Sequence, residues 1–66
     1  MENKSEVNLK ELREKIGVSQ QEVASACKIS RTYYGQIEKG ERNPGGKLAL
    51  RIADFYGINV RVLLED

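Results

Sequence analysis

The apolar residues in the middle of the chain recur at the spacing of short helices. Between residues 19 and 40 they form one stripe and then, about a turn further along, a second: Val23, Ala24, Cys27, Ile29, Tyr34 and Ile37. Because residues three and four apart share one face of a helix, this spacing predicts two short helices that are joined by a tight turn and pack on one interior. The second helix keeps a polar outward face of Arg31, Thr32, Gly35, Gln36 and Lys39.

Both of these helices carry a start signal. Ser19 and Ser30 are predicted N-caps, since a serine hydroxyl accepts a hydrogen bond from the otherwise unpaired N–H groups of a first turn. Ser19 and Glu22 have the spacing of a capping box, which gives Glu22 a structural role. The caps are eleven residues apart, which leaves room for about two helical turns and a corner. If Lys28 in that corner takes a positive φ, the left-handed conformation costs about 1 kcal/mol relative to glycine.

The last third of the chain begins with another amphipathic helix. Its inward stripe has the spacing i, i+3, i+4 and i+7 and consists of Ala49, Ile52, Ala53 and Tyr56. Residues 58–64 fit two structures. In the first, Asn59 caps a short helix whose inward residues are Val60, Leu63 and Leu64. In the second, a strand alternates through Ile58, Val60, Val62 and Leu64.

Paired residues along the central segment resemble the helix-turn-helix of the lambda and 434 repressor and Cro class, the Xre family. The pairs are Ser19-Gln20, Val23-Ala24, Ile29-Ser30, Ile37-Glu38 and Lys39-Gly40. The resemblance covers roughly residues 8–64, because a first helix is matched upstream by Leu9, Leu12, Arg13 and Ile16, and the family's loop and fourth helix are matched downstream by 40–44 and 48–53. The chain departs from the family at Lys28, where Gly or Asn is usual, and at Gly45-Gly46, which replaces a Ser cap and an apolar residue.

The resemblance implies an all-α fold, a compact bundle of five short helices around a central helix-turn-helix. It favours the helix over the strand for residues 58–64. One domain is expected over residues 1–66, with its core at about 8–64. A chain of 66 residues with 39% apolar residues is close to the size at which a single core barely suffices.

Cysteine and histidine usage limits the chemistry. The chain has one cysteine and no histidine, so neither an internal disulfide nor a zinc-finger ligand set is available, and we expect no metal and no cofactor. Cys27 lies on the inner stripe and is expected to be a small core residue rather than a redox sensor. Without a histidine, a cysteine-based constellation or a phosphate-binding glycine loop, the sequence indicates that the protein is not an enzyme.

Positive charge concentrates on the segment that resembles a DNA-binding motif. The whole chain has a formal net charge of only +1, but residues 28–51 carry six cations against two acids, whereas the remainder carries five cations against eight acids. This asymmetry favours nucleic acid as a partner of residues 28–51. No apolar run approaches the roughly 20 residues that span a bilayer, and the N-terminus lacks the apolar segment of a secretion signal, so we expect a soluble, cytoplasmic protein without a membrane partner.

Candidate DNA contacts follow from how such a motif docks. The second helix of the motif lies in the major groove with its N-terminal residues at base edges. Arg31 can pair with guanine, Gln36 with adenine, and Thr32 with a base or a thymine methyl group, while Tyr33 lies at the edge of the groove face. These four are the predicted base-reading residues. The predicted contacts to the DNA backbone are Gln20, Ser30, Lys39, Arg42, Asn43 and Lys47.

Two further residues on the motif need a structural explanation. Glu38 is an acid in a helix aimed at a polyanion, and the resemblance implies that it forms an internal ion pair with Arg13. Gly35 costs roughly 1 kcal/mol inside a helix relative to alanine. Either a close approach to the sugar-phosphate backbone or tight helix packing would account for this glycine.

The expected function is a sequence-specific transcriptional regulator. The resemblance to the family implies a repressor that binds a palindromic operator on double-stranded DNA as a homodimer. The candidate dimer seam consists of Leu48, Phe55, Ile58, Val60 and Leu64, because the C-terminal end carries more apolar surface than one small core can bury. The alternative is an antitoxin-type protein-binding module that neutralises a partner and autoregulates its operon; the sequence identifies no such partner.

Overall fold

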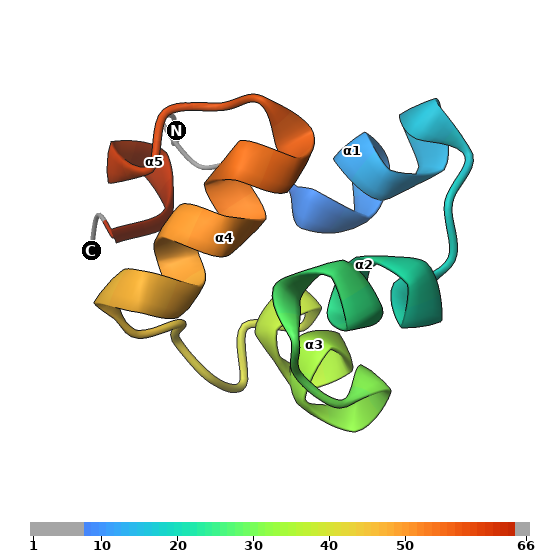
Figure 1. Ribbon diagram of the computed structural model, residues 1–66, viewed down its shortest axis with the longest axis horizontal. Helices are drawn as coiled ribbons and strands as arrows, with labels where there is room; N and C mark the ends of the chain where they lie inside the picture. The colour runs from blue at the N-terminus through green and yellow to red at the C-terminus, as the bar shows by residue number, and fades with distance from the viewer. Residues whose placement is uncertain (1–7, 65–66) are drawn as a thin grey trace.

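Helices account for most of the chain. The computed structural model describes residues 8–64, and over this range the helices follow one another as α1 (Leu9–Ile16), α2 (Gln20–Cys27), α3 (Arg31–Glu38), α4 (Gly46–Tyr56) and α5 (Arg61–Leu64). α2 packs against both α3 and α4, and α5 packs against α4 (Figure 1). The predicted all-α bundle of five short helices is confirmed within the described residues.

Side-chain caps start the first three helices. The Asn8 side chain accepts a hydrogen bond from the N–H of Glu11 at 3.1 Å. Ser19 and Glu22 form both bonds of a capping box, at 3.0 and 2.8 Å, and the Ser30 hydroxyl accepts the N–H of Tyr33 at 3.1 Å. The predicted serine caps are therefore confirmed. α4 differs, because its cap residue Gly45 has no side chain to make such a bond.

The corner between α2 and α3 is closed by a left-handed lysine. Lys28 has φ 65° and is the one non-glycine residue with positive φ in residues 8–64. The N–H of Ile29 bonds to the carbonyl of Ala24 at 2.9 Å, and the N–H of Lys28 bonds to that of Ser25 at 3.2 Å. These two bonds are a Schellman motif, which satisfies the last carbonyls of α2. Lys28 therefore has the left-handed conformation that the sequence analysis considered for this corner.

One core is shared by α1 to α4. Its buried apolar residues are Leu9, Val23, Ala24, Cys27, Tyr34, Ile37, Leu48, Ala49, Ile52 and Ala53. This set confirms the predicted inner stripes except at Ile29 and Tyr56, which are partly buried and pack against the core. Cys27 is completely buried, and burial raises the pKa of its thiol. The packing of α4 on α2 therefore supports the helix-turn-helix formed by α2 and α3.

Leu48 requires a correction. We expected it at an exposed dimer seam, but its exposed fraction is 8% and it belongs to the same apolar cluster as Tyr34 and Ile52. The start of α4 turns Leu48 inward beside Ala49, so this residue offers little surface to a partner.

The C-terminal residues form the helix and not the strand. The Asn59 side chain accepts the N–H of Arg61 at 2.9 Å, immediately before α5 begins. Val60 and Leu63 are half-buried, and Leu63 packs against the core. The side chain of Leu64 lies outside the described part of the chain.

Between residues 8 and 64, no helix has the length and apolar content to cross a bilayer.

Candidate nucleic-acid interface

α3 has one buried face and one polar outward face. Tyr34 and Ile37 are buried against the core. Arg31 and Thr32 at the N-terminal end are exposed, and Gln36 one turn later is partly exposed. The side chains predicted to read bases therefore lie along the outward side of α3, opposite its buried face.

Gln20 links the first helix of the motif to both ends of the second. Its side-chain Nε2 donates a hydrogen bond to Oε1 of Glu38 at 3.0 Å. Its Oε1 accepts a bond from Nη1 of Arg31 at 3.5 Å, at the limit of hydrogen-bond length. We predicted Gln20 as a phosphate contact, and the amide is engaged within the protein on both sides. This bridge between Glu38 and Arg31 has no signature in the sequence pattern.

Glu38 forms the internal ion pair that the family resemblance implied. Oε2 of Glu38 lies 2.6 Å from Nε of Arg13, and the two side chains are 4% and 14% exposed. Nη1 of Arg13 also donates to the carbonyl of Val18 at 3.1 Å. Burial alone raises the pKa of Glu38, but the hydrogen bonds from Arg13, Gln20 and Tyr34 and the Arg13 charge outweigh burial and leave this pKa below its ordinary value. The carboxylate is therefore ionised and neutralised from inside the fold.

A second polar contact ties α3 to α4. The hydroxyl groups of Tyr34 and Tyr56 are 2.6 Å apart, and Tyr34 is completely buried. Burial, followed by the hydrogen bond with Tyr56, raises the pKa of Tyr34 far above its ordinary value. A buried hydroxyl needs a partner, and the sequence could have indicated this pair only by placing two tyrosines on facing inner stripes.

The far edge of α3 carries a stacked pair. The guanidinium carbon of Arg42, in the loop after α3, lies 4.9 Å from the centre of the Tyr33 ring. Tyr33 is half-buried, whereas Arg42 is exposed. The sequence placed Tyr33 at the edge of the groove face, and the structure shows that this edge is shared with an arginine.

The other predicted backbone contacts belong to the two ends of α3, the following loop and the start of α4. Lys39 ends α3, Asn43 lies in the following loop, and Lys47 lies in the first turn of α4; all three are exposed. The Ser30 hydroxyl is occupied as the cap of α3. The cations Lys39, Arg42 and Lys47 follow the outward face of α3 along the chain, and all three are exposed.

Gly35 is not required by helix packing. A Cβ atom built there meets only the side-chain amide of Gln20, at 3.7 Å from Nε2 and Oε1. That separation is an ordinary van der Waals contact, so the fold itself has room for alanine. Of the two explanations that the sequence left open, tight packing is excluded.

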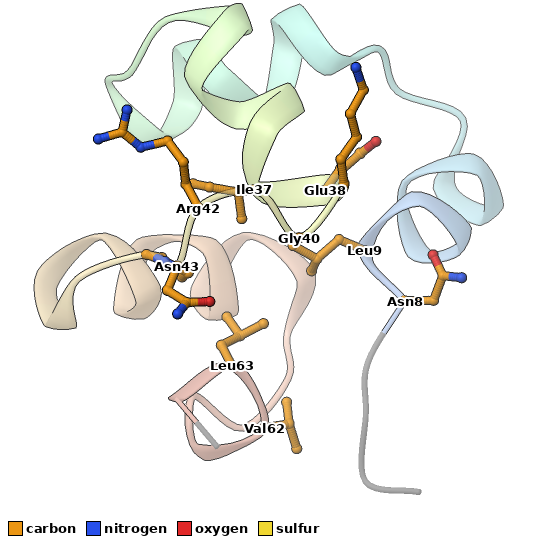
Figure 2. Close-up of a pocket in the computed structure, with 11 residues that line it drawn as sticks. Asn8, Leu9, Ile37, Glu38, Gly40, Arg42, Asn43, Val62 and Leu63 are labelled. Carbon is orange, nitrogen blue, oxygen red and sulfur yellow. The ribbon is translucent and has the colours of Figure 1, made fainter. Parts of the chain in front are cut away.

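A separate open groove of about 390 Å³ lies at the C-terminal end of α3. Its apolar lining residues are Leu9 at the start of α1, Ile37 near the end of α3, and Val62 and Leu63 of α5 (Figure 2). The Arg42 side chain extends from the loop away from Val62 and Leu63 (Figure 2). No cluster of acidic, cysteine or histidine side chains that could hold a metal occurs in residues 8–64.

Comparison with known proteins gives matches over almost all of the described chain. The family model described as Helix-turn-helix matches residues 9–63, from α1 into α5. The chain is 39% identical over 57 residues to the HTH-type transcriptional regulator DdrOP3 of Deinococcus deserti. The aligned segment spans 86% of this chain and 44% of that protein. The chain is 38% identical over 58 residues to the uncharacterized HTH-type transcriptional regulator YqaF of Bacillus subtilis. This second aligned segment spans 88% of the chain and 76% of that protein. The chain thus covers less than half of the first relative and about three quarters of the second.

Proposed function

We propose that this chain, which belongs to the helix-turn-helix family of the Cro and lambda-repressor type, is a transcriptional repressor. It occupies a palindromic operator as a homodimer. The family is one of DNA-binding transcriptional regulators. The observation that carries the proposal is the outward face of α3, where Arg31, Thr32 and Gln36 are accessible while the opposite face is buried in the core.

The chemistry of these side chains fits the edges of base pairs in the major groove. Arg31 can donate two hydrogen bonds to O6 and N7 of guanine, and Gln36 can pair with N6 and N7 of adenine. Thr32, between them on the helix surface, can bond to a base or contact a thymine methyl group. An α-helix with its side chains is about 10–12 Å across, so α3 suits entry into the roughly 12 Å wide major groove.

The buried polar bonds prepare this face for a polyanion. Arg13 removes the free negative charge of Glu38, and Gln20 connects that carboxylate to Arg31. We infer that Gln20 orients Arg31 while its backbone, in the first turn of α2, stays available for a phosphate at the positive end of a helix. Lys39, Asn43 and Lys47 supply further contacts to the DNA backbone.

Dimerisation places two copies of α3 on one face of the duplex. Half-buried apolar residues that remain at the C-terminal end of the monomer are Phe55, Ile58 and Val60. A two-fold interface through them would cover this apolar surface. One recognition helix contacts few base pairs, so a symmetric pair provides the affinity that a monomer with a formal charge of +1 lacks.

Selection of bound sequences from a random double-stranded DNA pool tests the proposal. We expect enrichment of an inverted repeat, protection of both half-sites in a footprint, and lowered expression of a reporter placed behind that site. The variant Lys10→Ala, which removes an exposed cation of α1, should select the same sequence as the wild type. Failure to enrich any sequence, together with a stoichiometric foreign protein recovered from the host, would replace this function by the antitoxin-type module.

A further inference from the structure

Two arginines flank the outward face of α3, and the fold holds each one in a different way. Arg31 and Tyr33 are two residues apart, so their side chains leave the helix about 200° apart around its axis. Arg31 leans to the side of α2 and meets Gln20. Tyr33 leans to the opposite side and carries Arg42 over its ring at 4.9 Å. The base-reading side chains Thr32 and Gln36 lie between these two edges.

The stack limits the freedom of Arg42 without using its hydrogen-bond donors. Arg42 is exposed and forms no ion pair within residues 8–64. A guanidinium that lies over an aromatic face keeps its N–H groups at its edge, where they remain free for a planar anionic partner. An arginine that is already ordered loses less side-chain entropy when it binds such a partner. Tyr33 therefore prepares Arg42 for an anion at this edge of α3.

We propose that Tyr33 is a positioning residue for Arg42 and that the pair forms a fixed contact to a DNA phosphate, at the edge of the major groove opposite Arg31. This inference rests on the proposed function and gives Tyr33 a role other than the base contact expected from the sequence. The half-buried ring is consistent with it, because part of its surface is covered by the protein and another part by Arg42. The anion is a phosphate and not a base, because the Arg42 guanidinium lies over the Tyr33 ring, at the side edge of the base-reading face and about 200° around the helix axis from Arg31.

A double-mutant cycle separates positioning from direct contact. The variants are Tyr33→Leu, Arg42→Ala, their combination, and Tyr33→Phe, each titrated on the selected DNA site at several salt concentrations. Arg42→Ala should weaken binding and reduce the slope of log affinity against log salt by about 0.9, the value for one phosphate. Tyr33→Leu should weaken binding about two- to tenfold, because an Arg42 side chain that is no longer ordered by the ring must lose its freedom on binding. The same change should have no further effect when Arg42 is already alanine.

Tyr33→Phe is the conservative variant, because it keeps the aromatic face and removes only the hydroxyl. It should bind within about twofold of the wild type and prefer the same bases. In the free protein, the side-chain protons of Arg42 should show an upfield ring-current shift by NMR that Tyr33→Leu abolishes and Tyr33→Phe retains. Circular dichroism establishes that each variant is folded, and Lys10→Ala again controls for the loss of a distant cation.

Three results would overturn the inference. The first is an equal loss from Tyr33→Leu with and without Arg42, the second is a changed base preference in Tyr33→Phe, and the third is the absence of the ring-current shift. The proposed function fails in a different way, through a wild-type protein that prefers no DNA sequence. The two failures are therefore distinguishable.

Discussion

Nε of Arg13 donates a 2.6 Å hydrogen bond to Oε2 of Glu38, and this single contact joins α1 to the last residue of the recognition helix. Glu38 is covered on its other side by Gln20, whose amide lies 3.0 Å from Oε1. A carboxylate enclosed in this way fixes the position of α3 relative to both α1 and α2. The acidic residue at the end of α3 is thus a structural element of the domain.

Removal of the Glu38 carboxylate should destabilise the fold. We expect Glu38→Ala to lower the free energy of unfolding by about 3 to 5 kcal/mol, because it leaves the largely buried Arg13 charge without a partner. Thermal and urea unfolding measure this loss. Affinity for DNA per folded molecule should fall less, since a negative charge is removed from the motif. Unchanged stability in both Glu38→Ala and Arg13→Ala would contradict the structural role.

The same pair should make stability depend on acid. The folded-state pKa of Glu38 is lowered relative to its ordinary value of 4.5. The stabilisation from this group is therefore fully present above that ordinary value and is lost as the pH falls through the lower, folded-state pKa. Glu38→Gln cannot lose a proton, so the stability difference between wild type and this variant should shrink as the pH is lowered below about 4.5. A pH-independent difference, measured by urea unfolding between pH 7 and pH 3, would contradict this assignment.

Gly35→Ala should separate folding from binding. The structure has room for the methyl group beside Gln20, so the variant should gain about 0.5 to 1 kcal/mol of stability from better helix propensity. If the glycine serves a close approach of α3 to the DNA backbone, as we expect, the same methyl group weakens binding. Thermal unfolding and anisotropy titration measure the two effects.

Ala26→Gly provides a matched control for that substitution. Ala26 is exposed on α2, so the reverse change there should lower stability and leave affinity per folded molecule unaltered. A Gly35→Ala variant that is both more stable and equally tight in binding would show that the glycine has no role at the DNA.

Local signals in the sequence predicted the elements of this fold well. Serines cap α2 and α3, and Glu22 completes the capping box of α2. The left-handed Lys28 is set by the short corner between the two helices. Such features are determined by neighbours along the chain, so a sequence pattern is sufficient to predict them.

The contacts that arrange the site could not be predicted in this way. The bond between Gln20 and Glu38 joins residues 18 apart, and the one between Tyr34 and Tyr56 joins residues 22 apart. Both depend on how the helices cross, which no local spacing specifies. The error at Leu48 has the same cause, since the predicted inward stripe of α4 did not include Leu48 and could not show that the fold buries this residue too.

The proposed reading of bases by α3 leads to a test at two positions. Replacing Arg31 or Gln36 by alanine should cost about 1 to 3 kcal/mol on the preferred site and relax the choice of base at one position for each variant. Binding to random DNA should change much less, because nonspecific affinity comes from phosphate contacts. Competition titrations with preferred and random duplexes compare the two. Equal losses on both duplexes would reassign Arg31 and Gln36 to the DNA backbone.

Dimerisation through the C-terminal seam should be removable without harm to the monomer. The most suitable positions are Ile58 and Val60, which are half-buried and outside the main core cluster, whereas Phe55 packs against that cluster. Lysine is the best replacement, because added positive charge cannot by itself weaken attraction to DNA. We therefore expect Ile58→Lys and Val60→Lys to sediment as monomers and to bind the operator more than about tenfold less tightly.

Leu50→Lys is the control, because Leu50 is an exposed leucine of α4, at 53% exposure, that is not part of the proposed seam. It should remain dimeric and bind normally. The wild-type operator should contain half-sites whose centres are about 10 to 10.5 base pairs apart, or a multiple of that, since a two-fold dimer presents its recognition helices one turn of DNA apart. A wild type that is monomeric both in solution and on a site without two-fold symmetry would refute the dimer, and loss of dimerisation in Leu50→Lys alone would move the interface from the C-terminal end to the outer face of α4.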